Sequence, residues 1–315
     1  MAGTDPLEGM SVFAAVVDAE SFTGAARQLR VSKGAVSQQI QKLEDRLGVR
    51  LLNRTTRRLS LTDEGRTYYE HCRRILDEAR DAVDALDNLG AAPRGVLRIN
   101  APMSFGILHL GPAVADFMKA YPEIEIDMSL NDRQIDVVEE GFDMAIRIAR
   151  LPDSSLIARR LAPCRRVVMA SPAYWDRRGR PTHPNDLKVH DALIYDYLPE
   201  PNTWTFKEPN TGPEGRFSVT VAGRYRANNG EVLLTAAKQG LGIDFAPTFF
   251  CCGELQSGEL ETVLSEYEDD PISVYAVYPH RRHLSPRVRA FVDFLADRFG
   301  ENPYWDEMCA NAPAA

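Results

Sequence analysis

Two serine-capped segments near the N-terminus constrain this chain more than any other feature. Ser21 is a candidate N-cap for a short helix over 22–29, and Ser32 for a longer helix that Gly48 ends. The longer segment repeats apolar residues at helical spacing, namely Val36, Ile40, Leu43 and Leu47. With a further helix expected over 6–19, the two capped helices and the short turn between them predict a helix-turn-helix.

A basic turn between two apolar pairs follows the longer helix. Leu51-Leu52 and Leu59/Leu61 flank this turn, which predicts a two-stranded wing. Residues 22–74 carry twelve Lys and Arg against five Asp and Glu, although the whole chain has a formal net charge of −8. A basic block on an acidic chain is typical of a segment that binds a polyanion, and a solvated helix face is the alternative. The pattern therefore favours double-stranded DNA as a partner.

The exposed face of the longer helix carries residue types that reach base edges and phosphates in a major groove. These residues are Lys33, Ser37, Gln38, Gln41 and Lys42. In the wing, Arg54, Arg57 and Arg58 are candidates for contacts with phosphates or with the minor groove. The sequence thus predicts a DNA-binding surface made of one helix face and one basic turn.

A long helix is predicted over 63–92, with Thr62 as its cap. Its apolar residues recur at spacings of three and four, namely Tyr69, Cys72, Leu76, Ala79, Val83 and Leu86. This seam favours pairing with the same helix of a second chain, and the alternative is a helix that lies on its own domain. Cys72 on the seam is interpreted as a small apolar filler.

Strand and helix signals alternate over residues 94–300, which predicts an α/β domain with a mostly parallel sheet. Strands are expected at 95–101, 124–130, 142–149, 165–170, 241–247 and 272–279. Helices are expected at 104–122, from Pro172, at 230–240 and at 285–299. The Gly111-Pro112 pair predicts an irregularity in the first of these helices.

The stretch from Phe13 to Gly65 resembles the N-terminal domain of the LysR-type transcriptional regulators. The resemblance rests on SFTGAARQL, VS-x-x-AVS-x-x-I-x-x-LE-x-x-LGV-x-L and R-T-T-R-R-L-x-LT-x-x-G. By position in this pattern, the residues expected to face the major groove are Ser32, Lys33, Ala35, Ser37 and Gln38, and those expected to support the wing are Arg54, Arg57 and Arg58. Gly34 departs from the pattern, and we expect the helix to tolerate it near its start.

Residues 141–187 and 227–247 resemble the effector-binding domain of the same family, which has the two-lobed fold of periplasmic solute-binding proteins. The resemblance implies an α/β protein overall. The expected domains are a winged helix-turn-helix over 1–62, a linker helix for dimerisation over 63–92, an effector domain over 93–303 and a flexible tail over 304–315. Lobe I is expected at about 93–165 and 270–303, and lobe II at about 166–269, with crossings near 164–168 and 267–271.

A ligand in such a fold lies between the lobes, beyond the strand ends. The loop 101–106 is expected to hold an anion through Ser104 and the amides of Phe105 and Gly106, with Arg147 adding positive charge. Candidates from the second lobe are Trp204, Asn228, Asn229, Pro247 and Thr248. The structural alternatives are N-caps for Ser104 and Asn229, an ion pair of Arg147 with Asp132 or Asp143, and a core position for Trp204. We expect a small anionic or polar effector.

Missing motifs narrow the function further. The six His residues show no zinc-binding spacing, and no GxSxG, P-loop or GxGxxG lies in a suitable context, so no enzyme activity, metal or cofactor is expected. Five scattered cysteines without a CxxC pair argue against a disulfide framework. The apolar runs are too short to span a bilayer and no signal peptide is visible, which favours a cytoplasmic protein without a membrane partner.

Two alternatives to an effector-modulated regulator stay open. One is a thiol redox sensor built on Cys251 and Cys252, and the other is a DNA-binding repressor that needs no effector. The expected partners are double-stranded DNA and further copies of the chain, as a dimer through the linker helix and as a tetramer. RNA polymerase is a candidate partner.

Overall fold

The computed structural model describes residues 5–54, 59–87, 93–133, 135–137, 140–149, 156–279 and 284–310. The chain forms two compact units, residues 1–91 and 92–315. The expected end of the linker helix at residue 92 lies next to this division. Within the described ranges, no helix is both long and apolar enough to cross a membrane.

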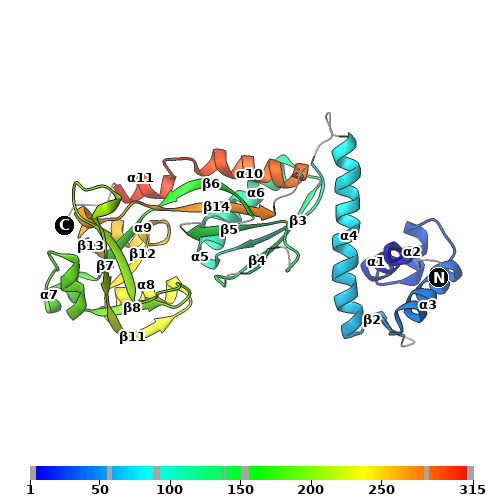
Figure 1. The fold of residues 1–315 in the computed structure, drawn as a ribbon, viewed down its shortest axis with the longest axis horizontal. Helices are drawn as coiled ribbons and strands as arrows, with labels where there is room; N and C mark the ends of the chain where they lie inside the picture. Colours follow the sequence, from blue (N-terminus) through cyan, green and yellow to red (C-terminus); the bar gives the residue numbers. More distant parts are fainter. Residues whose placement is uncertain are drawn as a thin grey trace. The chain divides into compact units, whose positions relative to one another are not determined.

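The N-terminal unit is helical with a small wing (Figure 1). Its elements are α1 (Met10–Asp18), α2 (Phe22–Gln28), α3 (Lys33–Leu47), β1 (Leu52–Arg54), β2 (Leu59–Leu61) and α4 (Asp63–Asp87). The Ser21 hydroxyl accepts from the amides of Thr23 and Gly24, and the Ser32 hydroxyl accepts from the amide of Ala35 at 3.1 Å. Gly48 ends α3 in the left-handed conformation, with φ 71°. The predicted helix-turn-helix and its caps are confirmed.

One apolar cluster holds this unit together. Phe13 and Ile40 are fully buried, and Leu43 is nearly so. Leu47 was expected to point inward, but it is 38% exposed because it lies in the last turn of α3, beyond the cluster. The strands β1 and β2 pair antiparallel, with Leu52 opposite Leu61, as the predicted wing requires.

The first half of α4 belongs to the same cluster, where α1 lies against it (Figure 1). Cys72 is fully buried, and Tyr69 and Leu76 pack beside it. Burial raises the pKa of the Cys72 thiol to about 11, in keeping with an apolar filler. This part of the seam therefore packs on its own domain. Ala79, further along the seam, is exposed, and the side chains of Val83 and Leu86 lie outside the described residues.

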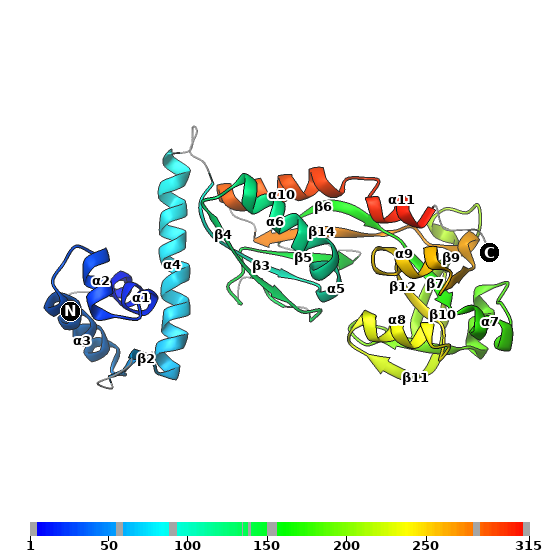
Figure 2. The same ribbon diagram turned by 180° about the vertical axis from the view of Figure 1, so that it is seen from behind.

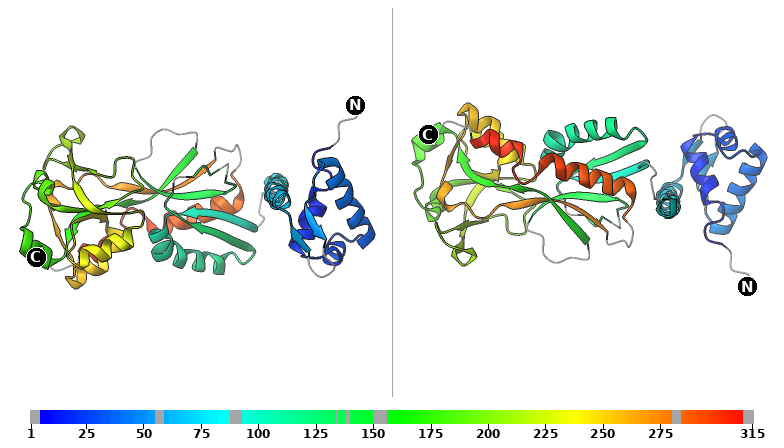
Figure 3. Two further views of the ribbon diagram at one scale, coloured as in Figure 1. Left: turned by 90° about the horizontal axis from the view of Figure 1, so that it is seen from below. Right: turned by 90° about the horizontal axis from the view of Figure 1, so that it is seen from above.

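Lobe I of the C-terminal unit is a five-stranded sheet covered by helices. The strand order is β4 (Ile124–Leu130), β3 (Gly95–Ala101), β5 (Met144–Ala149), β14 (Ile272–Pro279) and β6 (Leu156–Cys164). Its helices are α5 (Met103–Phe105), the π-helical η1 (Gly106–Leu110), α6 (Gly111–Ala120) and α10 (Pro286–Phe299). The rings of Phe117 and Phe291 lie 4.8 Å apart, so α6 and α10 pack against each other over the sheet (Figure 3).

The expectation of a mostly parallel sheet holds in lobe I for β4, β3, β5 and β6, which run in one direction, and it fails for β14. β3 pairs in parallel with β4 and β5, but β14 pairs antiparallel with both β5 and β6. β14 enters the sheet only after the chain returns from lobe II, so its direction does not follow from its own residues. The strand β6 was not expected, because Arg159 and Arg160 interrupt its apolar pattern. The predicted helix irregularity occurs as η1, directly before Gly111.

Lobe II is built from shorter sheets (Figure 2). β12 (Asp244–Pro247), β7 (Arg166–Ala170) and β13 (Glu261–Val263) form an antiparallel sheet in that order. β11 (Ala222–Ala227) pairs in parallel with β8 (Asp191–Tyr195), and β10 (Arg216–Thr220) pairs antiparallel with β9 (Thr203–Lys207). The α-helices are α7 (Pro172–Arg178), α8 (Gly230–Lys238) and α9 (Thr248–Ser257), and the 3-10 helices are η2 (Pro184–Val189), η3 (Pro213–Gly215) and η4 (Ser265–Tyr267).

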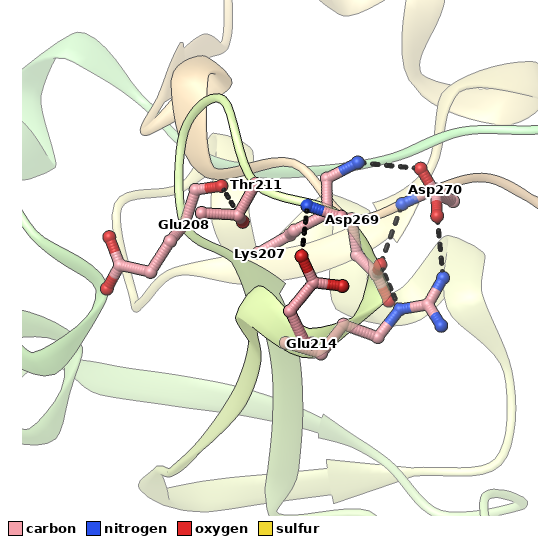
Figure 4. Close-up of polar contacts among 8 residues, drawn as sticks. Lys207, Glu208, Thr211, Glu214, Asp269 and Asp270 are labelled. Atoms are coloured by element: carbon pink, nitrogen blue, oxygen red, sulfur yellow. Dashed lines mark hydrogen bonds and ion pairs between the residues drawn. The ribbon is translucent and has the colours of Figure 1, made fainter.

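Ion pairs hold the two places where the chain crosses between the lobes. Arg165, between β6 and β7, pairs with Glu268, before β14, with Nη2 and Oε2 3.0 Å apart. Figure 4 shows the neighbouring acids Asp269 and Asp270 against the β9–β10 hairpin, where Lys207 Nζ lies 2.7 Å from Asp270 Oδ1. Arg216 pairs with both of these acids at 2.7 Å. The second crossing is thus anchored both to the first crossing and to lobe II.

The expected flexible tail is wrong for residues 304–310. They form α11 (Tyr304–Ala310), which packs against α9 (Figure 2). Trp305 is 1% exposed and belongs to the lobe I core. A single buried tryptophan anchors this short helix, and the Ala/Pro-rich composition of the chain end gives no signal of that contact. Residues 311–315 lie outside the described residues.

Candidate nucleic-acid interface and effector site

The exposed face of α3 presents the side chains that the sequence predicts for DNA. Lys33, Gln38 and Lys42 are exposed, while Ala35 and Ser37 are half-buried between them. The Ser32 oxygen already accepts from the amide of Ala35, so this residue positions the start of α3, and its hydroxyl proton is left to donate. The exposed face of α3 therefore presents lysine ammonium groups and a glutamine side-chain amide.

Glu44 is a residue of this region whose role the sequence interpretation missed. Its side chain is buried at 7% exposure, and Oε1 accepts from the amides of Leu51 and Leu52 at 2.8 and 3.1 Å. The carboxylate thereby ties α3 to the first wing strand. An acid next to the apolar Leu43 of the helix is the signal that points to such a buried acceptor.

Gly65 lets the start of α4 approach the wing closely. A Cβ at this position would lie 1.9 Å from the carbonyl oxygen of Leu51, so only glycine fits. Thr62 caps α4, since its hydroxyl accepts from the amide of Gly65 at 2.9 Å and donates to the carbonyl of Arg50 at 2.7 Å. These contacts fix the wing between α3 and α4.

Some cations of the basic block are committed within the fold. Arg46 Nη1 donates to the carbonyl of Asp5 at 2.9 Å, and Arg73 Nη1 lies 2.9 Å from Asp18 Oδ1. The side chain of Arg54 and residues Arg57 and Arg58 lie outside the described residues. Their contacts with phosphate stay a prediction.

Arg147 on β5 has an unmet hydrogen-bonding capacity. Its Nη1 donates to Asn100 Oδ1 at 2.7 Å and to the carbonyl of Ile146 at 2.9 Å. Its Nη2 is buried and lacks a partner among the described residues. Burial lowers the pKa of this guanidinium, and Asp143 pairs with Arg287 at 3.4 Å instead. A buried cationic donor without an acceptor among the described residues is one feature that a site for an anion requires.

The lobes touch in the region where Arg147 lies. Because Asn100 near the end of β3 pairs with Ala145, Arg147 lies beside the loop that follows β3. From this loop, Met103 Sδ lies 3.8 Å from Asn229 Nδ2 of lobe II. Burial, together with the nearby Asp132 carboxylate of lobe I, raises the pKa of Tyr195 of lobe II. Two contacts between lobes therefore surround the start of α5.

In the loop 101–106, the amide of Gly106 is not available to an anion as expected. The amide of Gly106 donates to the carbonyl of Pro102 at 2.8 Å, and the amide of Met103 donates to Asp132 Oδ1 at 2.8 Å. A Cβ at Gly106 would lie 2.3 Å from Leu130 Cδ2, so the glycine serves close packing. Phe105 is fully buried in the lobe I core, and Ser104 is only 7% exposed. The N-cap residue of α5 is Pro102, so Ser104 is not the cap that its structural alternative predicted.

The lobe II candidates mostly have structural roles. Trp204 is 4% exposed, with its ring 5.3 Å from that of Phe245, so its core alternative holds. Thr248 is 1% exposed and donates its hydroxyl to Asp306, while Pro247 is the N-cap residue of α9. Asn229 caps α8 by accepting from two amides, as its alternative predicted, and its Nδ2 still reaches Met103.

Asn228 donates to the hydroxyl of Tyr197 at 3.1 Å. It and Asn229 stay near the lobe contact, whereas the buried Trp204 and Thr248 are not available to a ligand.

The two adjacent cysteines differ in state. Cys251 is a free, fully buried thiol, and burial raises its pKa. Cys252 is disulfide-bonded, with a partner outside the described side chains. The pair therefore does not form a vicinal disulfide. In the part of the chain that the structure describes, no group of three or more His, Cys, Asp or Glu could hold a metal ion.

Comparisons with known proteins agree with both units. Residues 7–66 match the model of the bacterial regulatory helix-turn-helix protein, lysR family, and residues 90–300 match the LysR substrate binding domain. An HTH-type transcriptional regulator of Xanthomonas campestris is 39% identical over 99% of this chain and 90% of its own length. The HTH-type transcriptional activator AaeR of Escherichia coli is 38% identical over 94% of each chain. The solved LysR-type regulator CrgA of Neisseria meningitidis is 34% identical, with TM-score 0.59, over 95% of this chain and all of that one.

Proposed function

Because the chain belongs to the LysR family of transcriptional regulators, we propose that the exposed face of α3 reads double-stranded DNA and that an anionic effector at Arg147 modulates this binding. The helix-turn-helix unit is the DNA-binding part of this regulator, and the C-terminal unit is its effector-binding part. The DNA contacts we assign are those of Lys33, Ala35, Ser37, Gln38 and Lys42, with Ser32 at the helix start. Arg54, Arg57 and Arg58 are assigned to phosphate.

One observation carries the effector proposal, namely the buried Nη2 of Arg147 without a partner among the described residues. A carboxylate there would accept a charge-assisted hydrogen bond and remove the cost of an unsatisfied buried donor. Ser104, Asn228 and Asn229 lie on the two lobes near this point and are proposed to contact the rest of the effector. We therefore expect a small organic carboxylate rather than a cation.

Thermal denaturation with a panel of aliphatic and aromatic monocarboxylates, each beside its neutral amide, tests the effector proposal. At least one carboxylate should raise the melting temperature of the full-length protein, and its amide should not. Arg147→Gln should abolish the shift. Arg160→Gln is the matched control, because Arg160 is an exposed arginine of the same lobe that already pairs with Glu301 at 2.6 Å. An equal shift in Arg147→Gln would remove Arg147 from the site.

Assembly is proposed through the exposed part of the α4 seam. Ala79 is exposed, although it belongs to the same row of apolar residues as the buried Cys72. We propose that this part of α4 pairs with a second chain, and that two such dimers form a tetramer. We also propose that the protein is cytoplasmic and contacts RNA polymerase. Light scattering of Ala79→Glu should show a smaller assembly than wild type. An unchanged mass would place the dimer contact elsewhere.

Redox sensing stays a second candidate, because Cys252 is disulfide-bonded. Non-reducing peptide mapping of the protein before and after peroxide, together with DNA binding of Cys252→Ser, tests this candidate. DNA binding that peroxide and Cys252→Ser both leave unchanged would remove it. A repressor without an effector would instead give no ligand-induced shift with any carboxylate, and the unpaired Arg147 would then need another explanation.

A further inference from the structure

The helix α11 follows the matched effector domain, which ends at residue 300, and it contacts both lobes. On the lobe I side, Trp305 is 1% exposed, and its ring lies 4.6 Å from that of His109 and 5.8 Å from that of Phe105. Phe105 directly follows Ser104 in the loop after β3. The C-terminal helix therefore packs behind the loop that faces the proposed effector.

On the lobe II side, α11 is bound to α9. The Thr248 hydroxyl donates to Asp306 Oδ1 at 2.6 Å, and Cys252 Sγ lies 2.9 Å from the carbonyl oxygen of Trp305. Thr248 and Cys252 are both nearly fully buried. Thr248 and Cys252 lie on two successive turns of α9, so α11 packs along this helix. Of the two contacts, only that of Thr248 is a hydrogen bond, because the disulfide-bonded Cys252 has no thiol proton.

Helix α9 is itself shared between the two cores. Phe249 packs in the lobe I core, whereas Cys251 and Leu255 pack in the lobe II core. His109 joins the same arrangement, with Nε2 2.9 Å from the carbonyl of Phe249 and Nδ1 2.5 Å from the hydroxyl of Tyr304. Burial lowers the pKa of His109, so the ring is neutral and can donate to one partner and accept from the other. One imidazole thus connects α9, α11 and η1.

The segment that His109 holds is π-helical. The segment η1 covers Gly106–Leu110 between α5 and α6, and π-helical turns are frequent at functional sites. Side chains from other segments pack around this turn. Here the surroundings are Phe249, Tyr304 and Trp305, of which two belong to α11.

We propose that α11 is a strap that ties the two lobes together and holds residues 103–110 in position for the effector. Trp305 and His109 act as positioning residues, because they contact the loop and not the proposed ligand. A change in lobe orientation would have to alter either the Trp305 contacts in lobe I or the Thr248–Asp306 bond at lobe II. The consequence for the effector response rests on the proposed function, but the mechanical claim does not.

Amide hydrogen exchange of the full-length protein without any ligand tests the strap. Thr248→Val removes the hydroxyl that binds Asp306 while nearly keeping the side-chain shape. We expect amides of 103–110 to exchange about tenfold faster in this variant, and those of β9 and β10 to be unchanged. The matched control is Thr205→Val, because Thr205 bonds only Ser218 across the β9–β10 hairpin, at 3.4 Å, and should leave 103–110 at the wild-type rate.

If α11 stays packed on α9 in Thr248→Val, a second variant still tests the proposal. A chain ending at Pro303 lacks α11 entirely and should lose protection at 103–110 while lobe II stays protected. Unchanged protection at 103–110 in this chain would overturn the strap. Equal loss of protection in both lobes would also overturn it, since α11 would then be an ordinary part of the core. DNA binding of the same variants reports separately on the N-terminal unit, so failure of the strap and failure of the proposed function give different results.

Discussion

The exposed face of α3 and the lobe contact around Arg147 differ in how the fold uses the residues that the sequence singles out. On α3, Lys33, Gln38 and Lys42 stay exposed. Around Arg147, most candidates are used by the fold itself, with Phe105 in an aromatic core and Thr248 bonded to Asp306. A convex helix face needs only its own caps and core, whereas a site between lobes is built by packing from distant segments.

This difference explains which roles of acidic residues the sequence did not predict. Glu44 and Asp132 both accept hydrogen bonds from backbone amides. Glu44 accepts from Leu51 and Leu52, and Asp132 accepts from Met103. Glu44 supports a surface whose outline the helical pattern already predicts. Asp132 changes the site itself, because it takes up an amide at the loop where an anion was expected.

The largest effect is expected at Glu44. Glu44→Ala leaves two buried amides without an acceptor and should lower the free energy of unfolding of the N-terminal unit by about 2 to 4 kcal/mol. Chemical denaturation measures this change, and DNA binding should weaken with it. Asp45→Ala is the control, because Asp45 is an exposed acid next in the chain. Equal stabilities of the two variants would mean that the α3 surface does not depend on its tie to the wing.

A comparable effect is expected inside lobe II, at Asp244. Burial raises the pKa of this carboxyl from 3.8 to about 7, and its Oδ2 is unpaired. The folded state then holds a proton that the unfolded state releases, so the contribution of Asp244 to stability decreases as pH rises from about 4 to 7. Asp244→Asn should be more stable than wild type at pH 8, by up to about 4 kcal/mol, and should lose that advantage near pH 4. Urea denaturation at both pH values measures this difference in the free energy of unfolding. A difference that does not depend on pH would contradict the raised pKa of Asp244.

On the DNA side, Lys33 and Gln38 should separate affinity from specificity. Lys33→Ala should weaken binding to all sequences and reduce the salt slope by about one, because one phosphate contact is lost. Gln38→Ala should instead relax base preference, with about 1 to 3 kcal/mol less discrimination at one position. Fluorescence anisotropy over a salt series, with matched and mutated sites, measures both. The same response from both variants would mean that α3 is not oriented as proposed.

The smallest effect is expected at Gly34, which lies in the first turn of α3. A Cβ there would meet only Ser32 Oγ, at 3.8 Å, so alanine fits without strain. Gly34→Ala should stabilise the N-terminal unit by about 1 kcal/mol through helix propensity, as a thermal melt would show. If stability rises while DNA affinity falls, the glycine serves close approach to the duplex, and the α3 surface is less tolerant than its exposure indicates.

The sequence was sufficient where local chemistry decides the structure. Ser21, Ser32 and Gly48 mark the helix ends in the positions expected from capping, and β3, β4 and β14 have the predicted bounds. It was insufficient where distant segments decide. The antiparallel direction of β14 depends on its return from lobe II, and α11 depends on one buried tryptophan. The roles of Phe105 and Gly106 depend on what packs behind the loop, which neither residue type reveals.

The most direct test of the central claim is a selection of genomic DNA fragments by the purified full-length protein, with and without metabolite extract, beside Gln38→Ala. We expect wild type to enrich fragments that share one inverted repeat, extract to change that enrichment, and Gln38→Ala to lose the shared sequence. No shared repeat under either condition would contradict a specific DNA reader, and a repeat that extract never affects would contradict its control by an effector.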